Sequence, residues 1–465
     1  MSKANTQPPK GTRDFLPDDI RRRHYVTTLF REVFEGHGFS PLETPALERL
    51  QALLGKYGDE GDQLLFKVLL RGQPLVDGIR SAAEHIAQPG GLISGRSGET
   101  APGAETMLAD LGLRYDLTVP LARVVAAYQG KLPAVFKRYQ IQPVWRADTP
   151  GKGRYREFYQ CDVDVVGTES RLVEAEVTAV AATCLTRLGF DDFTLRLNHR
   201  GLLRAVVERC GIDLSLEGDA VTAIDKLDKV GEAGVRAELS QRGVPDAAAD
   251  TLLSLLSGEV TLDRVAEFCA GHAGGEAAVA QLRELLSLSE MTPAGPYLHF
   301  DLTLARGMGY YTGCIFEIAV SDLAGSLGGG GRYDGLIGMF SGKDVAACGL
   351  SLGLERILVV MEDRGMFPTQ LRPHTTAIGM VAESEGRAAL SLSQACRQAG
   401  LAVDLRPNRI KPGKLKKYAD EQGMAAAVWF EAGQPDRVSI WRKDGPSEQD
   451  VAVGEVPERL RSAEH

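Results

Sequence analysis

The chain has 465 residues, of which 44% are hydrophobic and 25% charged, as in a globular protein of two or three domains. No apolar run approaches the roughly 18 to 20 residues of a membrane span, and the first residues lack the apolar core of a signal peptide, so we expect a cytoplasmic protein. The net charge of −9 argues against nonspecific nucleic-acid binding over the whole surface, and the 7 cysteines, without a CxxC spacing, predict reduced thiols and no zinc site.

The first predicted element is a helix from about Asp18 to Glu35. Its two leading aspartates suit the positive end of a helix, and apolar residues recur at helical spacing through the segment. The following sequence, GHGFSPLETPALE, indicates an extended segment. Residues 68–111 then interrupt the pattern, and residues 90–103 are rich in Gly, Ser and Pro. We expect residues 68–111 to be an insertion at the tip of a hairpin, in part flexible.

Residues 113–119 alternate in polarity and predict a strand with Asp116 and Thr118 on one face. A carboxylate and a hydroxyl two residues apart can both accept hydrogen bonds from an ammonium group. A purely structural role, in which Asp116 pairs with a nearby arginine, is the alternative. A helix is predicted to follow over residues 121–128.

Two β-prone runs on either side of a short Pro/Gly loop predict an antiparallel hairpin over residues 139–167. Gln160, Asp162 and Asp164 alternate along its second strand and therefore share a face. Between residues 131 and 160 there are seven Lys or Arg against two Asp or Glu. A basic loop beside a polar strand face suits a phosphate-bearing substrate next to a small polar one. An amphipathic hairpin with a solvated basic tip would have the same pattern.

After the hairpin, the sequence predicts a helix over residues 169–188 and a strand over residues 193–199. Residues 204–289 are then rich in Leu, Ala and Glu, with repeated helical spacing. Between residues 213 and 290 there are 15 acidic and 6 basic residues. We therefore predict a mainly helical insertion domain that does not hold phosphates over a broad face.

An arginine and two tyrosines follow the next predicted strand, at residues 299–305. Their sequence, RGMGYYTG at residues 306–313, leads into a further predicted strand over residues 314–320. Arginine at the end of a strand, beside glycine and two tyrosines, is expected where side chains face a pocket. A glycine-rich turn with its tyrosines packed on an edge is the alternative.

Residues 328–335, GGGGRYDG, have neither the spacing of a P-loop nor the context of a dinucleotide-binding turn. Glycines between strands more often mark a close approach of backbones within a sheet. Residues 349–357 predict a strand that runs into a helix. From residue 373 onward, strands and helices alternate, which predicts a small α/β domain with a mainly parallel sheet.

Together these stretches resemble the histidyl-tRNA synthetase family of class II aminoacyl-tRNA synthetases. WRAD and RYREF, on either side of the hairpin loop, resemble the second class II motif, and YQCDVDVVG resembles its histidyl version. LRYDLTVPLAR, LARGMGYYTG and GGGRYDGL are similar to segments at the histidine site of that family, and GLSLGLERI is similar to the third class II motif. KGTRDFLP and the helix and extended segment after it resemble the amino end and the first motif, which builds the dimer interface in that family.

The resemblance covers nearly the whole chain except residues 68–111, and it implies a multidomain fold of α/β and α+β type. The expected parts are a class II antiparallel-sheet catalytic domain split between residues 1–200 and 291–366, the insertion at 68–111, a helical insertion domain at 201–290 and a C-terminal α/β anticodon-binding domain at 373–465.

The resemblance also implies a homodimeric enzyme that ligates L-histidine to tRNA(His) through histidyl-adenylate, with ATP as a substrate and Mg²⁺ as a cofactor. Arg146 and Arg306 would be catalytic, because positive charge must face the α-phosphate. The implied ATP-binding residues are Arg146, Asp148, Arg154, Phe158, Arg306 and Arg356. The implied histidine-binding residues are Asp116, Thr118, Gln160, Asp164, Tyr310 and Tyr311. The residues that would hold a metal are not implied.

Within these sets, Phe158 would stack on adenine and Asp148 would meet its amino edge, while Arg154 and Arg356 would hold the triphosphate tail. Asp164 and Tyr311 would contact the imidazole ring. Three positions depart from the pattern that is usual in the family. These are Asp148 in place of Glu, Thr149 in place of the Arg of some versions, and Gly309 in place of an acidic residue.

Two other hypotheses belong to different functional classes. A non-catalytic histidine-binding paralogue could act as a regulatory subunit of ATP phosphoribosyltransferase, but that paralogue lacks the C-terminal domain and commonly loses the paired arginines, which this chain keeps. A nucleic-acid-binding protein without enzyme activity would leave Asp116, Gln160 and Asp164 unexplained. Histidine-dependent ATP–pyrophosphate exchange, with and without tRNA, separates the three hypotheses.

Overall fold

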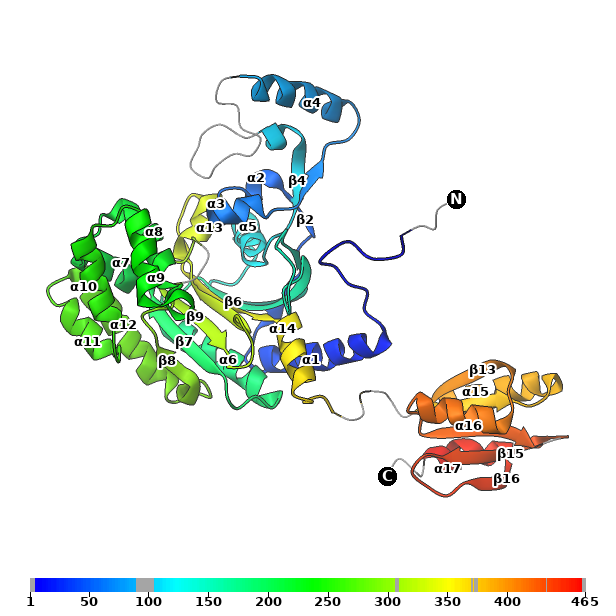
Figure 1. Cartoon of the computed structure of the whole chain (residues 1–465). Coiled ribbons are helices and arrows are strands. Elements are labelled where there is room, and N and C mark those ends of the chain that lie inside the picture. Colours follow the sequence, from blue (N-terminus) through cyan, green and yellow to red (C-terminus); the bar gives the residue numbers. More distant parts are fainter. Residues whose placement is uncertain are drawn as a thin grey trace. The chain divides into compact units, whose positions relative to one another are not determined.

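In the computed structural model, the described residues are 5–88, 104–305, 309–368, 371, 375–431 and 433–461. The chain divides into two compact units, residues 1–366 and residues 367–465 (Figure 1). Each unit has its own strands and helices and is taken by itself below. Among the described residues, none of the helices combines the length and the hydrophobicity that crossing a bilayer requires.

An eight-stranded sheet forms the centre of the first unit, in the order β1-β5-β6-β11-β10-β9-β7-β8. Every pairing from β5 to β7 is antiparallel, whereas the outer strands β1 and β8 pair in parallel with β5 and β7. The fold is therefore the antiparallel sheet that the sequence predicted. The strands are β1 (Ser40–Pro41), β5 (Phe136–Trp145), β6 (Glu157–Val166), β7 (Thr194–His199), β8 (Leu298–Phe300), β9 (Cys314–Ala319), β10 (Gly328–Arg332) and β11 (Ala347–Gly353).

The predicted hairpin is confirmed as β5 and β6, which pair over ten residues from Phe136 opposite Val166 to Trp145 opposite Glu157. Odd-numbered residues of β6 from Cys161 onward are apolar and buried, whereas Gln160, Asp162 and Asp164 point to the opposite face. The two faces of this strand therefore meet different environments, one a hydrophobic core and the other a polar cavity.

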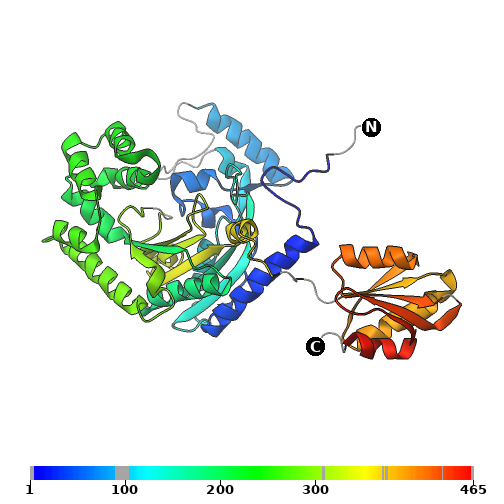
Figure 2. The same cartoon turned by 60° about the horizontal axis from the view of Figure 1, so that its bottom comes forward.

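Helices cover both faces of the sheet. Helix α1 (Pro17–Gly36) packs against α6 (Leu172–Arg187) and α14 (Leu354–Asp363). All three contact β6, α6 also contacts β11, and Figure 2 shows the helices from that side. Helices α5 (Thr118–Tyr128) and α13 (Asp334–Ser341) pack together in a cluster that also contains Val166 and Ala347, at the ends of β6 and β11.

The insertion lies between two antiparallel strands of a smaller sheet, in the order β2-β4-β3. Helix α4 occupies the connection between β3 and β4 and packs on a short turn, η1 (Figure 1). The approach is close, because a Cβ at Gly78 would lie 2.3 Å from the Met107 carbonyl oxygen. The elements of this part are β2 (Leu47–Arg49), α2 (Leu50–Leu53), α3 (Gly58–Gln63), β3 (Lys67–Leu69), α4 (Gln73–Ile86), η1 (Ala104–Met107) and β4 (Ala109–Leu113).

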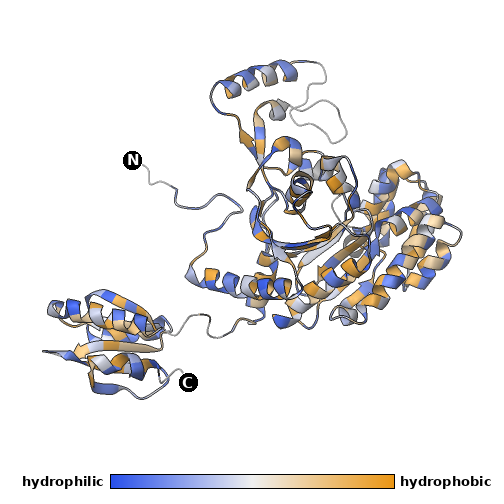
Figure 3. Cartoon of the chain, turned by 180° about the vertical axis from the view of Figure 1, so that it is seen from behind, coloured by the Kyte–Doolittle hydropathy of each residue, from blue (hydrophilic) through white to orange (hydrophobic). Residues whose placement is uncertain are grey.

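The stretch after β7 is helical, as predicted, and Figure 3 shows hydrophobic and hydrophilic residues alternating along its helices, as in amphipathic packing. His199 and His272 begin two of these helices, and the ring nitrogen of each accepts a hydrogen bond from a backbone N–H of the first turn. The helices are α7 (Arg200–Arg209), α8 (Glu217–Ile224), α9 (Leu227–Gln241), α10 (Asp246–Leu256), α11 (Leu262–Phe268) and α12 (Ala273–Ser289).

Two predicted strands differ from the structure. The strand predicted at residues 113–119 is wrong, since β4 ends at Leu113 and Thr118 already begins α5. The strand predicted at residues 299–305 ends at Phe300, where the carboxylate of Asp301 accepts a hydrogen bond from the backbone N–H of Thr303 and turns the chain.

The second unit is a five-stranded sheet in the order β13-β12-β14-β15-β16. The prediction of a mainly parallel sheet is wrong, because β12 pairs in parallel with β13 and β14 while β15 and β16 add two antiparallel pairings that the sequence did not indicate. Separate hydrophobic clusters form on its two faces. The elements are β12 (Thr375–Met380), α15 (Gly386–Gln398), β13 (Ala402–Arg409), α16 (Pro412–Glu421), β14 (Ala426–Glu431), β15 (Gln434–Arg442), β16 (Glu448–Ala452) and α17 (Val456–Arg461).

Candidate active site

A cavity of about 750 Å³ lies on the polar face of the large sheet. Its lining comes from β6, β9, β10 and β11, from the start of α5, from the loop between β5 and β6, and from α14. Eleven of the twelve residues predicted from the sequence line it, and the twelfth, Arg306, lies outside the described residues. The eleven are Asp116, Thr118, Arg146, Asp148, Arg154, Phe158, Gln160, Asp164, Tyr310, Tyr311 and Arg356.

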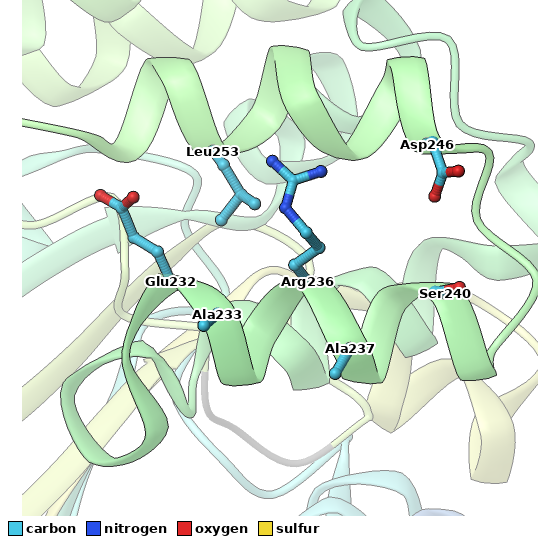
Figure 4. A pocket seen from close by; sticks show the side chains of 7 residues that line it. All are labelled: Glu232, Ala233, Arg236, Ala237, Ser240, Asp246 and Leu253. Carbon is cyan, nitrogen blue, oxygen red and sulfur yellow. The ribbon is translucent and has the colours of Figure 1, made fainter.

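A second, more open groove of about 530 Å³ lies between α9 and α10 of the helical part (Figure 4). Small side chains such as Ala233 and Ala237 line much of it, and its arginine, Arg236, is ion-paired with Asp250 at 2.5 Å. None of the predicted residues borders this groove. The first cavity is therefore the candidate active site.

Asp116 forms one wall of the cavity and is almost completely buried. Its Oδ1 accepts hydrogen bonds from the Tyr57 hydroxyl at 3.1 Å and from the Val119 backbone N–H at 3.0 Å, and its Oδ2 accepts one from the Tyr310 hydroxyl at 3.2 Å. Burial raises the pKa of Asp116, while the bond from Val119 and the positive charge of Arg146 oppose the rise. The contact with Val119 also explains why the predicted strand is a helix start, because a carboxylate at this place caps the first turn of α5.

Asp164 lies on the floor of the cavity and is held from two neighbouring strands. Arg138 Nη2 on β5 is 2.8 Å from Asp164 Oδ2, and the Tyr333 hydroxyl, just after β10, donates to Asp164 Oδ1. Burial raises the pKa of the Tyr333 phenol well above its usual value, which keeps it a hydrogen-bond donor. On the same face, Gln160 Nε2 donates to Ser351 Oγ on β11 at 3.0 Å.

Two glycines allow these side chains to lie flat on the sheet. A Cβ at Gly349, on β11, would lie 2.0 Å from Asp164 Oδ1, and a Cβ at Gly331, on β10, would lie 2.9 Å from the ring of Tyr311. The predicted close approach at the glycine run is therefore correct, although the approaching groups include functional side chains as well as backbone.

The opposite end of the cavity carries the arginines. Arg146 Nε donates to the Tyr115 carbonyl oxygen at 3.0 Å, and its guanidinium lies 4.2 Å from the Tyr115 ring centroid and 5.2 Å from that of Phe158. Arg154 Nη2 lies 2.8 Å from Asp148 Oδ1. Arg356 Nη1 donates to the Ser326 carbonyl oxygen at 2.6 Å. Positive charge is thus concentrated at this end, where three of the residues that the resemblance assigns to ATP lie.

The amino-terminal KGTRDF segment packs against this end of the cavity. The Gly11 carbonyl oxygen accepts a hydrogen bond from the Arg156 backbone N–H at 2.8 Å. The guanidinium of Arg13 lies 3.4 Å from the ring centroid of Tyr155 and 3.7 Å from the carboxylate of Glu355. The segment therefore braces the loop that carries Arg154, a contact that the sequence did not indicate.

The sequence analysis did not assign the residues around Asp164. Arg138 and Tyr333 hold its carboxylate, and Asp162, which the sequence placed on the same face without a role, lies beside it. The hairpin register would have placed Arg138 opposite Asp164, whereas nothing local connects Tyr333 with either residue. Lys226, at the end of α8, shows that the helical part also borders the cavity.

The geometry is matched by similarity to known proteins. A sequence profile described as "Histidyl-tRNA synthetase" matches residues 106–357, which include most of the cavity. A protein of Christiangramia forsetii named "Histidine--tRNA ligase" is 39% identical over 428 residues, covering 90% of this chain and 91% of that protein. The chain belongs to the histidyl-tRNA synthetase family. Within the family, a Leifsonia xyli protein of the same name is 45% identical over 363 residues, covering 76% of this chain and 80% of that protein.

The fold agrees with the family assignment. The crystal structure titled as histidyl-tRNA synthetase from Nostoc sp. PCC 7120 superimposes with a TM-score of 0.75 at 26% identity, covering 99% of this chain and all of that one. Among the residues that the structure describes, no three His, Cys, Asp or Glu side chains gather as a metal site would require.

Proposed function

We propose that this protein activates L-histidine with ATP and transfers it to tRNA(His), as a histidine–tRNA ligase. The observation that carries the proposal is that one cavity joins a carboxylate-lined floor to an arginine-lined end. A small amino acid with two polar ends would lie on the floor, and the phosphates of ATP would lie at the arginines. The carboxylate of histidine would then face the α-phosphate.

The floor supports histidine recognition. Asp116, Thr118 and Gln160 present acceptors to the α-amino group, and Asp164 and Tyr311 present one polar partner to each imidazole nitrogen. Asp164 is fixed by Arg138 from one side, so its carboxylate cannot turn away from the ring. Tyr310 contacts Asp116 and would act through that residue.

The reaction proceeds in two steps. A carboxylate oxygen of histidine attacks the α-phosphorus, the bond to the β-phosphate oxygen breaks, and pyrophosphate leaves. The terminal ribose hydroxyl of the tRNA then attacks the carbonyl carbon of histidyl-adenylate, and AMP leaves. Arg146, with Arg306 by resemblance, would stabilise the charge on the α-phosphate. Phe158 and Asp148 would hold adenine, and Arg154 and Arg356 would hold the triphosphate tail.

Magnesium fits this site as part of the nucleotide complex. Mg²⁺ commonly uses one or two protein carboxylates together with phosphates and waters. Glu317 and Glu355 line the cavity near the arginine end, and Glu355 is already engaged by Arg23 at 2.8 Å and by the Tyr159 backbone N–H at 2.9 Å. Glu317 is also engaged, by Arg196 at 3.0 Å. Either carboxylate would therefore hold the ion only by sharing it with the triphosphate and waters, and the ion would neutralise charge on the triphosphate.

The resemblance of the amino-terminal motif to the family's dimer-forming segment supports a homodimer, which sedimentation equilibrium can measure. We place the reaction in the cytoplasm, with the second unit as the anticodon-binding part.

The deciding experiment is ATP–pyrophosphate exchange dependent on L-histidine, followed by charging of tRNA(His). Exchange without charging would contradict the ligase. Histidine binding without exchange would instead favour the regulatory paralogue. The presence of Arg146, Arg356 and the second unit argues against that alternative.

A further inference from the structure

The floor of the cavity holds a buried carboxylate that the proposed reaction has not used. Asp162 lies between Gln160 and Asp164 on the cavity face of β6, opposite Gln140 on β5 and Ser351 on β11. It lines the cavity, yet only 2% of its surface is exposed. Its Oδ1 atom has no hydrogen-bond partner among the described residues. A buried oxygen of this kind is costly unless a ligand satisfies it.

A second unsatisfied acceptor lies next to it. The amide oxygen of Gln160, two residues earlier on the same face, is also buried without a partner, because only its amide nitrogen is engaged with Ser351. Two neighbouring acceptors without donors fit a ligand group with several N–H donors. An ammonium group has three and no acceptor. Asp116, across the cavity, already accepts three hydrogen bonds. It therefore has little capacity left to accept the three N–H groups of an ammonium ligand.

The charges on the floor also favour a cation. Arg138 lies 2.8 Å from Asp164 but 3.8 Å from Asp162, so one guanidinium serves two carboxylates. The other charged or titratable groups near Asp162 are Asp116, Tyr311, Cys161 and Arg114. Arg114 donates its hydrogen bonds to the Thr44 and Pro143 carbonyl oxygens and to Gln142, and it forms no ion pair with Asp162. Within ion-pair distance, the carboxylates of Asp162 and Asp164 therefore share the single positive charge of Arg138.

A proton on Asp162 reduces the negative charge on the floor. Burial, together with the nearby charge of Asp164, raises the pKa of Asp162 to about 7, although Arg138 and a hydrogen bond with Ser351 oppose the rise. Near neutral pH a substantial fraction of the molecules therefore carries the proton. A cation placed against Oδ1 would favour the ionised form and expel the proton to solvent.

We propose that Asp162 is a further specificity-determining contact for the substrate, whose carboxylate binds the α-ammonium group of L-histidine and releases a proton as it does so. This inference rests on the proposed histidine site and adds a contact to it. Protonated Asp162 and the ammonium group give ionised Asp162 paired with the same ammonium group, and one proton goes to the buffer. Because the complex contains the ionised form, affinity for histidine rises with pH up to about 7 and levels off above it.

Calorimetry of L-histidine binding to the full chain without ATP tests the proposal. Titrations at one pH in two buffers of different ionisation enthalpy give the number of protons released. We expect wild type to release more protons than Asp162→Asn at pH 7, and the difference to become smaller at pH 8, where more of the free carboxyl is already ionised. Subtracting the number of protons that the variant releases removes any proton that the ligand itself contributes. Equal proton release by the two proteins at pH 7 would overturn the proposal.

Ligand fragments locate the contact. Histamine keeps the amino group and should release the proton, whereas imidazolepropionate lacks the amino group and should not. Proton release with imidazolepropionate would contradict an ammonium contact. These measurements use wild type alone, so they remain decisive if Asp162→Asn does not fold.

Kinetics provide a second readout. The ratio of the histidine KM of Asp162→Asn to that of wild type should rise several-fold between pH 6 and pH 8, on the order of one pKa unit of linkage, because only wild type must lose a proton at the lower pH. A constant ratio would contradict the proposal. Glu32→Gln removes one exposed carboxylate of α1 and serves as the matched control, with no change in the ratio. If wild type shows no histidine-dependent exchange at all, the proposed function fails, whereas normal exchange with a constant ratio removes only the role of Asp162.

Discussion

Arg154 Nη2 lies 2.8 Å from Asp148 Oδ1, across the loop that joins β5 to β6. The proposed function assigns Asp148 to adenine and Arg154 to the triphosphate, which are opposite ends of ATP, so we expect this ion pair to open when the nucleotide binds. The carboxylate side chain is 10% exposed and the guanidinium 53%. The pair thus keeps a mostly buried carboxylate satisfied until adenine replaces the arginine.

Replacing Arg154 should weaken ATP binding without affecting histidine. In Arg154→Gln the charge that meets the triphosphate is lost, and because this arginine is half exposed its contribution is on the order of 1–2 kcal/mol. We expect the ATP KM to rise about 5- to 30-fold and the histidine KM to stay within twofold. Pyrophosphate exchange measured against each substrate in turn gives both values.

Lys152 offers the matched control in the same loop. It is 66% exposed and pairs with Asp363 at 2.6 Å, on the exposed surface of the molecule. Lys152→Gln removes an equal charge, and we expect the ATP KM to change less than twofold. An equal effect of the two substitutions would mean that the loop acts only through its total charge.

The hairpin shows how much the sequence could predict. Apolar alternation and a Pro/Gly loop determine strands β5 and β6, and period two then places Gln160 and Asp164 on one face. Those are local properties of the chain. The resemblance to a family supplied the remaining site residues, and the cavity brings together all of those that the structure describes.

The errors had both local and non-local causes. Asp116 caps a helix through Val119, three residues later, and this contact overrides the strand-like alternation around it. Tyr333 contacts Asp164 only because β6, β11 and β10 are neighbours in the sheet, which no sequence period encodes. The antiparallel strands β15 and β16 follow β14 and pair beside it, and the strand and helix alternation before them gave no sign of this.

Gly349 should be required for histidine binding. A methyl group there would overlap Asp164 Oδ1 at 2.0 Å and the Val163 carbonyl oxygen at 2.7 Å. Because the backbone oxygen cannot move, Asp164 must leave its place above the strand. We expect Gly349→Ala to raise the histidine KM at least tenfold and to lower stability by about 1–3 kcal/mol. Exchange kinetics and urea unfolding measure the two effects.

Gly335 is the control for that substitution. It lies in α13, directly after the RYD sequence, and a Cβ there meets nothing within 4 Å. Alanine should be tolerated or slightly stabilising, because it favours the helix. A loss of histidine affinity in Gly335→Ala as large as in Gly349→Ala would show that the glycines act through flexibility rather than space.

Asp164 should select histidine. Asp164→Asn keeps the shape of the side chain but replaces an acceptor oxygen with a donor and leaves Arg138 without its close carboxylate. A site built to pair with polar groups of its substrate loses large factors when one pairing fails, so we expect the histidine KM to rise on the order of 10²-fold or more. The ATP KM should remain within threefold. Overlapping histidine curves for wild type and variant would remove Asp164 from the site.

Removal of the second unit should separate activation from charging. All described residues that line the cavity belong to the first unit, residues 1–366. The second unit has hydrophobic clusters made of its own residues, so the cut after Met366 separates two units that each have a core. We expect the shortened chain to retain at least a tenth of the pyrophosphate exchange rate but to charge tRNA(His) more than 10²-fold more slowly. The physical reason is that amino-acid activation needs only the cavity, whereas charging also needs the affinity that a second contact with the tRNA adds. Circular dichroism and the unfolding midpoint establish that the shortened chain is folded. Loss of exchange in a folded protein would mean that the second unit supports the cavity itself, and equal charging by both proteins would mean that it does not contact the tRNA.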